Sequence, residues 1–167
     1  MKALHCHPET PAPAVRVEAA VSRVPGGLKA SYRWSGDLAA LRIPAPRPAR
    51  FAEGLWRRGC CELFVAPEGK AGYHEFNFSP SGEWAAFAFR GYRERSPLRL
   101  AAPQVEVRRE PSGLELDAQV AMPPGAARIG LCAVLEALDG SLSYWALEHA
   151  PGRPDFHHAR AFAWRLA

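Results

Sequence analysis

Acidic and amide side chains stand at positions in this chain where they could contact a ligand. Glu62 interrupts the otherwise apolar run Cys60–Ala66. The segment Tyr73–Phe78 alternates strictly, so Glu75 and Asn77 share one face of the strand that it predicts. A buried carboxylate needs a partner, because an unpaired buried charge is costly. Either an arginine pairs with Glu62, or Glu62 joins Glu75 and Asn77 in a polar cluster that suits ligand binding.

Trp56 is the aromatic residue best placed to contact a ligand. The other tryptophans are expected to pack in the core of a β-protein; they are Trp34, Trp84, Trp145 and Trp164. Trp56 instead follows a proline-rich stretch, stands before Arg57 and Arg58, and precedes the next predicted strand. A ring at such a junction can stack on the C–H face of a sugar, whose hydroxyl groups then need a few fixed polar partners.

No signature of a self-sufficient catalytic site occurs in the chain. It has no Gly-x-Ser-x-Gly elbow, no phosphate-binding loop and no Gly-x-Gly-x-x-Gly motif. His5 and His7 flank Cys6 without an obvious further ligand, and the adjacent His157 and His158 would point apart in a strand. We therefore expect no metal site. A glycosidase-type pair of carboxylates is the least favoured interpretation.

The composition is that of an ordinary globular protein. Of the 167 residues, 48% are hydrophobic and 23% are charged, which argues against disorder. The formal net charge is +4, but the basic residues are scattered, so we expect a solvated basic surface and no nucleic-acid partner. No stretch resembles a membrane helix or a secretory signal. We expect the four cysteines to be reduced thiols and the protein to be cytoplasmic.

Short apolar runs separated by turns follow one another along the whole chain. Sixteen prolines and fourteen glycines punctuate it, which favours strands over long helices. Strands are predicted over 15–21, 28–34, 38–43, 60–66, 73–78, 84–89, 105–108, 114–120, 129–138, 144–147 and 162–166. The third is weak, and 129–138 could also be a short helix, although Gly130 and the turn at Asp139-Gly140 favour a strand. The prolines of Pro44–Pro48 predict a loop that extends to Gly54.

This pattern predicts an all-β protein of about ten antiparallel strands. Such a number in one chain is typical of a two-sheet sandwich of the jelly-roll or immunoglobulin-like kind. Residues 60–90 would form a three-stranded meander within it. No internal repeat or boundary divides the chain, so residues 1–167 are expected to form a single ligand-binding domain.

Several stretches resemble a known group of domains. The run Leu55–Phe64, the segment Tyr73–Pro80, and a tail with Ser143–Trp145 and Pro154–Phe162 are similar to the family-9 carbohydrate-binding modules and the related DOMON-like domains. The chain looks most like the stand-alone bacterial branch of that group. The resemblance covers roughly residues 50–167 and matches in the order and spacing of motifs, whereas the opening strands match only in pattern.

The resemblance implies a β-sandwich with a ligand site at one edge, where two aromatic rings hold a terminal sugar. Trp56 and Glu62 have the family's spacing between the first ring and a glutamate. The second ring falls on Phe156, six residues before Phe162, where the family has a tryptophan and hence more stacking area. The acidic clusters that bind calcium in those modules have no counterpart here. The polar positions of the family's middle strand fall on Glu75, Asn77 and Ser79. Asn77 and Ser79 differ in type from the residues of the sugar binders.

The predicted function is that of a non-catalytic domain that binds a carbohydrate or sugar-like ligand, with no cofactor and no membrane or nucleic-acid partner. Some DOMON relatives bind haem through Met and His, so a haem- or redox-cofactor domain with Met122 and either His149 or His157 is the alternative. A protein-interaction module without a small ligand is the third interpretation. The aromatic-lined site at the edge of the sandwich would comprise Trp56, Glu62, Glu75, Asn77, Phe156 and, as a donor at the rim, His157.

Overall fold

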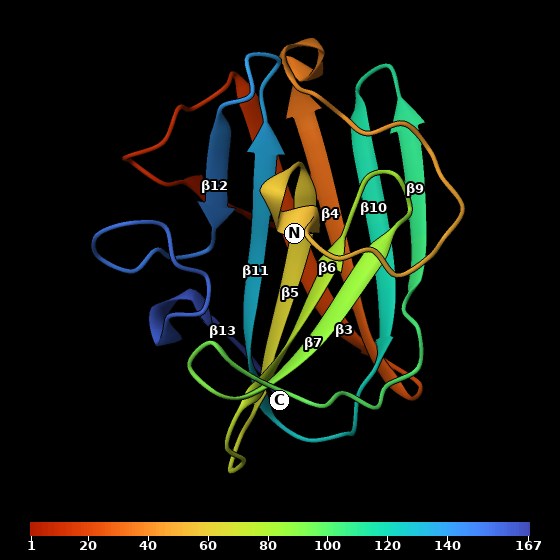
Figure 1. Ribbon diagram of the computed structural model, residues 1–167, viewed down its shortest axis with the longest axis vertical. Helices are drawn as coiled ribbons and strands as arrows, with labels where there is room; N and C mark the ends of the chain where they lie inside the picture. Colours follow the sequence, from red (N-terminus) through yellow and green to blue (C-terminus); the bar gives the residue numbers. More distant parts are fainter.

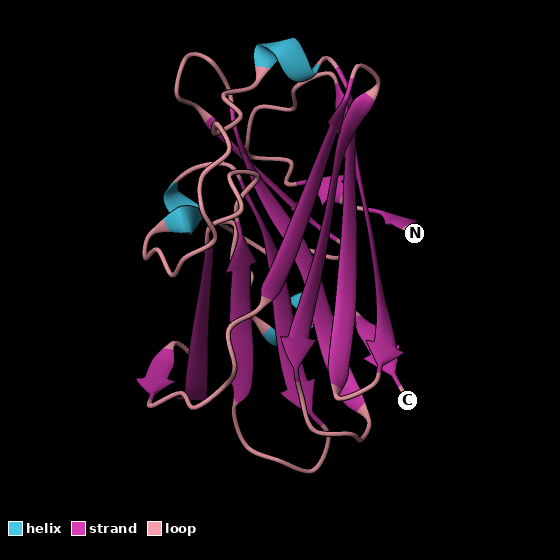
Figure 2. Cartoon of the chain, turned by 90° about the vertical axis from the view of Figure 1, so that its right-hand side faces the viewer, coloured by secondary structure: helices cyan, strands magenta, loops and turns pink.

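The computed structural model describes all 167 residues and folds them into two antiparallel sheets that pack face to face (Figure 1). Figure 2, turned by 90°, shows the strands of the two layers running past each other with loops along one side. The predicted all-β sandwich is confirmed. No helix in the structure has the length and apolarity needed to cross a membrane.

The strands divide unequally between the two sheets. The smaller sheet contains, in spatial order, β1 (Lys2–Ala3), β3 (Val15–Val24), β4 (Gly27–Gly36), β10 (Gly113–Ala121) and β9 (Gln104–Glu110). The larger sheet contains, in spatial order, β2 (His5–Cys6), β12 (Leu142–Ala146), β11 (Ala127–Glu136), β5 (Cys60–Pro67), β6 (Tyr73–Phe78), β7 (Trp84–Gly91) and β8 (Glu94–Ser96). A last strand, β13 (Trp164–Leu166), also pairs with β11. Beyond the predicted strands, the structure adds β1, β2 and β8, which have only two or three residues each.

The opening hairpin follows the period-2 pattern of its sequence. β3 and β4 pair in register up to Val24 opposite Gly27. The turn between them places Gly26 at a φ of 77°, a left-handed conformation that glycine adopts without steric cost. Alternation then directs Val17 and Val21 into the core. The hairpin predicted at this end of the chain is confirmed.

The larger sheet is buried on both faces. Its inner face meets the smaller sheet in a core cluster of 25 buried residues, to which Leu63 belongs. Its outer face carries a second cluster of seven buried residues, to which Phe64 belongs. A strand covered on both sides reads as a continuous apolar run, which explains the composition of β5. Cys60 and Cys61 accordingly lie on opposite faces, as their adjacency in a strand predicted.

Three segments cover the outer face of the larger sheet. The loop 44–54 leads into the short 3-10 helix η2 (Leu55–Arg57), which lies in front of β5 in Figure 1. The turn between β7 and β8 and the segment 147–163, with η3 (Ala159–Ala161), complete the cover. The predicted loop is confirmed, and β7 holds it: the N–H of Trp84 donates to the carbonyl of Arg50 at 3.0 Å, and the N–H of Ala52 donates to the carbonyl of Trp84 at 2.8 Å.

The strand predicted over 38–43 is wrong. Its first half forms the 3-10 helix η1 (Leu38–Ala40), and only Leu41 makes an isolated bridge, to Ala137. The reason lies in the sheet order: β4 already has β3 and β10 on its two sides, so the segment that follows finds no free edge beside it. The segment 129–138, in contrast, is the strand β11, because β5, β12 and β13 occupy its two edges.

Candidate functional site

The outer face of the larger sheet carries a cavity of about 260 Å³, which we call the outer-face cavity. It lies over the middle strands of the sheet and beneath η2, the β7–β8 turn and the segment that follows β12. This cavity lies on a sheet face, whereas the sequence predicts a site at an edge of the sandwich; the covering segments enclose what would otherwise be exposed strand surface. The lining residues are Trp56, Glu62, Glu75, Phe89, Arg93, Arg95, Val134, Tyr144, Pro154, Phe156 and His157.

Two glutamates form the base of the cavity. Glu62 on β5 pairs in register with Asn77 on β6, so Glu75 lies one diagonal step away on the same face. Their residues are only 3% and 5% exposed. The Glu62 carboxyl accepts a hydrogen bond from the thiol of Cys60 at 3.4 Å, and Glu75 accepts one from Nδ2 of Asn77 at 2.8 Å. The arginine ion pair considered for Glu62 is not formed, so the alternative of a shared polar cluster is the one that the structure adopts.

The environment of this pair favours the protonated form. Burial, with a further contribution from the neighbouring charge of Glu75, raises the pKa of Glu62 from 4.5 to about 8. Burial also raises the pKa of Glu75, and the hydrogen bond from Asn77 partly offsets this rise. At neutral pH the base of the cavity therefore holds a proton, and its oxygens can both donate and accept hydrogen bonds.

Asn77 supports the cavity from below and does not line it. Its side chain is fully buried, and its Oδ1 has no hydrogen-bond partner. Since Nδ2 is committed to Glu75, the residue orients that carboxylate. Asn77 therefore positions Glu75 in this geometry, and the direct contact predicted between Asn77 and a ligand stays a prediction.

His157 lies inside the cavity, whereas the sequence predicts it at the rim. Its side chain is 14% exposed, and the rings of Phe64 and Phe89 pack against its imidazole. Burial lowers the pKa of His157 to about 4, so the ring is neutral at neutral pH. Nδ1 lies 2.8 Å from the hydroxyl of Tyr73, and Nε2 lies 3.5 Å from a carboxylate oxygen of Glu75. The neutral tautomer with its proton on Nε2 fits both neighbours.

Aromatic rings enter the cavity from both sides. Trp56 on η2 is half-buried, and its ring meets Phe87 edge to face with 5.9 Å between centroids. Phe156 on the other side is 7% exposed and packs against Tyr144 at 5.9 Å. Phe156 therefore contributes less open surface than a stacking platform requires. Tyr144, which is half-buried and lines the same cavity, is the ring on that side with more accessible surface.

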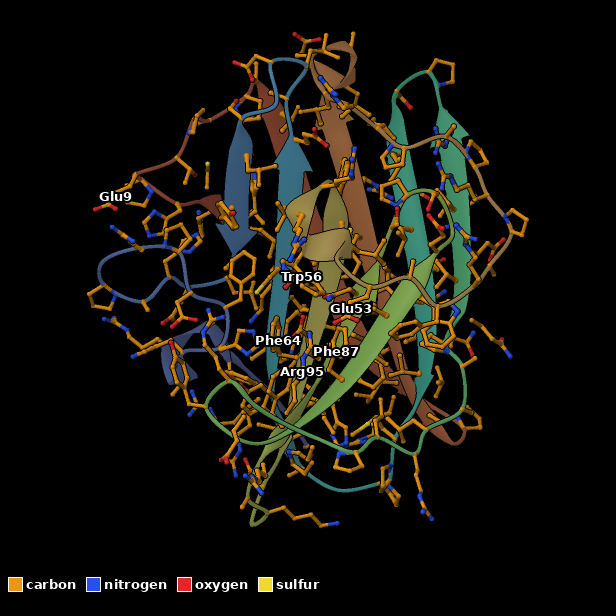
Figure 3. All side chains as sticks on the ribbon, in the orientation of Figure 1. Glu9, Glu53, Trp56, Phe64, Phe87 and Arg95 are labelled. Atoms are coloured by element: carbon orange, nitrogen blue, oxygen red, sulfur yellow. The ribbon has the colours of Figure 1, made fainter.

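Two arginines reach the cavity from the β7–β8 region, and each is held by an acidic partner. Nη2 of Arg93 lies 2.8 Å from Oδ1 of Asp155, and Nη1 of Arg95 lies 2.7 Å from Oε1 of Glu53. The guanidinium of Arg95 also lies 4.0 Å from the centre of the Phe87 ring. Figure 3 shows Arg95 beside Phe87, close to Trp56.

Five of the six residues predicted for the site line one cavity, and Asn77 lies directly beneath it. Their contact with a ligand stays a prediction. Sequence reasoning missed Phe89, Arg93, Arg95 and Tyr144. The alternation of the strands could have placed Phe89 on the cavity face. Residues opposite each other in neighbouring strands share a face, and Phe89 pairs with Tyr73. The arginines depend on a turn with a β-bulge, in which Arg93 has a φ of 56°, and no periodicity predicts that placement.

The haem alternative depends on a pair formed by Met122 and either His149 or His157. Met122 packs in the core between the sheets, whereas His157 lies in the cavity on the outer face. His149 packs against His7 and Phe156 instead. The Met122–histidine pairs are therefore not formed. No three His, Cys, Asp or Glu side chains are grouped so that they could hold a metal ion.

Comparison with known proteins finds solved structures that share this fold. No family model and no curated protein matches the sequence. A Bacteroides uniformis protein to which carbohydrate binding has been ascribed superposes with a TM-score of 0.67 at 17% identity, over 95% of this chain and 82% of that one. A family-9 carbohydrate-binding module from Caldicellulosiruptor kristjanssonii, in complex with glucose, gives 0.56 at 8% identity, over 85% and 71%.

A complex of such a module from the same organism with cellotriose gives a TM-score of 0.55 at 8% identity, over 85% of this chain and 70% of that one. The match extends over most of both chains in all three cases. At these identities the likeness establishes a shared architecture, and the chain has the β-sandwich fold of carbohydrate-binding modules.

Proposed function

We propose that this chain is a non-catalytic carbohydrate-binding domain whose site is the outer-face cavity. The observation that carries the proposal is the pair of buried carboxyl groups, Glu62 and Glu75, at the base of a cavity with aromatic walls. Buried oxygens with unused hydrogen-bonding capacity are costly unless a ligand or water satisfies them. The family-9 neighbours, which were solved with glucose and cellotriose, support the sugar as ligand class.

The size and chemistry of the cavity fit one sugar ring. Its volume of about 260 Å³ is just below the range of roughly 300–1,000 Å³ for sites that enclose drug-sized ligands. A ring that enters between Trp56 and Tyr144 would place its C–H faces against aromatic surface. Its hydroxyl groups would then reach the two carboxyls and the Nε2–H of His157. Since one ring and a few hydrogen bonds must offset the cost of association, a dissociation constant of about micromolar to millimolar is expected.

A glycan array followed by titration of the tryptophan fluorescence tests the proposal. Trp56→Ala should abolish binding of any glycan that the wild type retains. Trp164→Ala is the matched control, because Trp164 is also half-buried but lies on β13 outside the cavity. Bound glycans should show no new reducing ends after prolonged incubation. A blank array, or full binding by the Trp56→Ala variant, would contradict the proposed function.

A further inference from the structure

We propose that the sugar recognised in the outer-face cavity bears a free, cationic amino group, which the two buried glutamates at its base receive. This inference rests on the proposed function and narrows its ligand class to amino sugars. The geometric basis is that Glu62 and Glu75 are nearly inaccessible from outside, line the cavity, and have only uncharged groups as hydrogen-bond partners.

Acidic residues in and beside the cavity outnumber basic ones, although the chain as a whole carries a formal charge of +4. Arg93 and Arg95 are the cationic lining residues, and Asp155 and Glu53 already pair with them. When these four residues are counted together, their charges cancel. Glu62 and Glu75 then remain without a cation, because His157 is neutral. A cation on the ligand would complete this arrangement, whereas an anion would be repelled.

The groups that face Glu62 include no cation that lacks an acidic partner of its own. Cys60 and Glu75 face it from its own strand and from β6, and Cys132 and Tyr144 face it from β11 and β12. The hydroxyl of Tyr32, from the smaller sheet, donates to its backbone carbonyl at 2.7 Å. Burial raises the pKa of each of these thiols and hydroxyls, which keeps them uncharged. Arg93 is the only cation among these neighbours, and it is bonded to Asp155.

The aromatic walls add a second reason to expect a cation. Trp56, Phe89 and Tyr144 surround the carboxyl groups from the two sides of the cavity. The negative faces of such rings attract an ammonium group, most strongly where water is excluded. A hydroxyl group gains nothing comparable from the rings. The same walls that can stack on a sugar therefore favour an amine over a hydroxyl at the position nearest the two carboxyls.

Binding of an ammonium group has a consequence that can be measured. At neutral pH the Glu62 carboxyl holds a proton, because its pKa is about 8. When the ammonium group arrives, the O–H bond of that carboxyl breaks, the proton passes to solvent, and a charge-assisted N–H···O hydrogen bond forms. Nothing is oxidised or reduced. About one proton per ligand is therefore released, whereas a neutral sugar leaves the carboxyl protonated and releases none.

Calorimetric titrations of the full chain with D-glucosamine, D-glucose and N-acetyl-D-glucosamine test the inference. The measurements are made at about pH 6.5, where an amine of this kind is protonated, in two buffers that differ in ionisation enthalpy. We expect glucosamine to bind about tenfold more tightly than glucose, equivalent to about 1.4 kcal/mol. Only glucosamine should release a proton, and the acetylated sugar should bind no better than glucose, because its amide carries no charge.

Glu62→Gln isolates the role of the carboxyl. Glutamine resembles the protonated acid that the folded protein prefers, so the variant should fold. It should lose the proton release and the preference for glucosamine, so that its affinities for glucosamine and glucose become equal. Glu18→Gln is the control, since Glu18 lies on the smaller sheet and pairs with the exposed Arg16. Methylammonium chloride as a probe should bind far more weakly than glucosamine; equal binding would overturn the assignment to a sugar.

The outcomes separate the two proposals. If glucose, or a neutral glycan found on the array, binds as tightly as glucosamine, the amine inference is wrong and carbohydrate binding stands. The same holds if glucosamine binds without proton release. If neither amino sugars nor neutral glycans bind, the proposed function itself fails.

Discussion

Glu62 and His157 show how burial, as the largest cause, sets the protonation of a site. Both are ionisable groups in one cavity, and desolvation moves each toward its neutral form. The pKa therefore rises for the carboxyl and falls for the imidazole. At neutral pH the cavity thus holds a protonated acid and an uncharged base. These are the two hydrogen-bonding groups that a polyhydroxylated ligand would meet.

The two shifts predict how stability depends on pH. The raised pKa of Glu62 contributes stability that is complete below pH 4.5 and is lost as the pH rises to about 8. The lowered pKa of His157 contributes stability that is complete above pH 6.5 and is lost as the pH falls to about 4. The two contributions together make the free energy of unfolding highest at about pH 4.5–6.5, which is the interval between the ordinary pKa values of glutamate and histidine.

Urea unfolding between pH 6.5 and about 8 measures the alkaline decline, which should approach about 1.4 kcal/mol per pH unit for one proton. The same series with Glu62→Gln should lose most of that decline, because glutamine does not titrate. The acid side is a weaker test, because paired carboxylates elsewhere, such as Glu115 and Asp117, also lose stability there. A wild-type stability that rises between pH 6.5 and 8 would contradict the burial of a protonated Glu62.

At the scale of elements, β6 connects the segments that roof the cavity. Tyr73, its first residue, accepts a hydrogen bond from the backbone N–H of Arg93 at 3.0 Å and contacts Nδ1 of His157 at 2.8 Å. Its ring stacks on Phe89 of β7 with 4.8 Å between centroids. One hydroxyl thus ties the β7–β8 turn and the segment after β12 to the centre of the sheet.

Tyr73→Phe removes that hydroxyl and keeps the stacked ring. We expect a loss of about 1–3 kcal/mol in unfolding free energy, since the change leaves a buried imidazole nitrogen without a partner. Glycan affinity should fall as well, because His157 and Arg93 lose their common anchor. Tyr92→Phe serves as the comparison: Tyr92 is 61% exposed, so water can replace the hydrogen bonds of its hydroxyl with Asp155 and Arg93, and the change should cost less than Tyr73→Phe. Equal losses from the two variants would show that Tyr73 does not anchor the roof.

At the scale of the whole molecule, the larger of the two hydrophobic cores and the candidate site lie on opposite faces of one sheet. The 25-residue core fills the space between the two sheets, while the cavity lies over the outer face. Variants at half-buried cavity residues such as Trp56 should therefore alter binding with little effect on folding. Variants on the inner face should do the reverse.

Trp145→Ala tests this separation. Trp145 lies in the inner core, is 6% exposed, and donates from Nε1 to the hydroxyl of Ser143 at 2.9 Å. Its removal should cost about 3–5 kcal/mol in unfolding free energy, as for other buried aromatic residues. Trp56→Ala should cost clearly less, because Trp56 is half-buried. Denaturant titrations of both variants give the comparison, and a larger cost for Trp56 would place it in the structural core instead.

The sequence by itself determined the strands, the turns and the face on which each side chain lies. Alternation with period 2 put Glu75 and Asn77 on one face. The continuous apolar run of β5 indicated a strand buried on both faces, and Glu62 lies within that run. These are local properties, since neighbouring dihedral angles and burial patterns act over a few residues. For the same reason the pattern predicted most elements correctly and failed at 38–43, where a missing partner edge decided the conformation.

Only the tertiary structure decided which strands became neighbours and which face was roofed. Tyr144 and Glu62 are 82 residues apart, and no pattern in either segment reveals that β11 alone separates their strands. Burial of Phe156, the inward placement of His157 and the arrival of Arg93 and Arg95 depend on loops packed against the sheet. Such long-range pairings depend on the total burial and hydrogen bonding of the chain, which no local segment encodes. The composition of the cavity is therefore a property of the fold, although nearly half of its lining residues were predicted from the sequence.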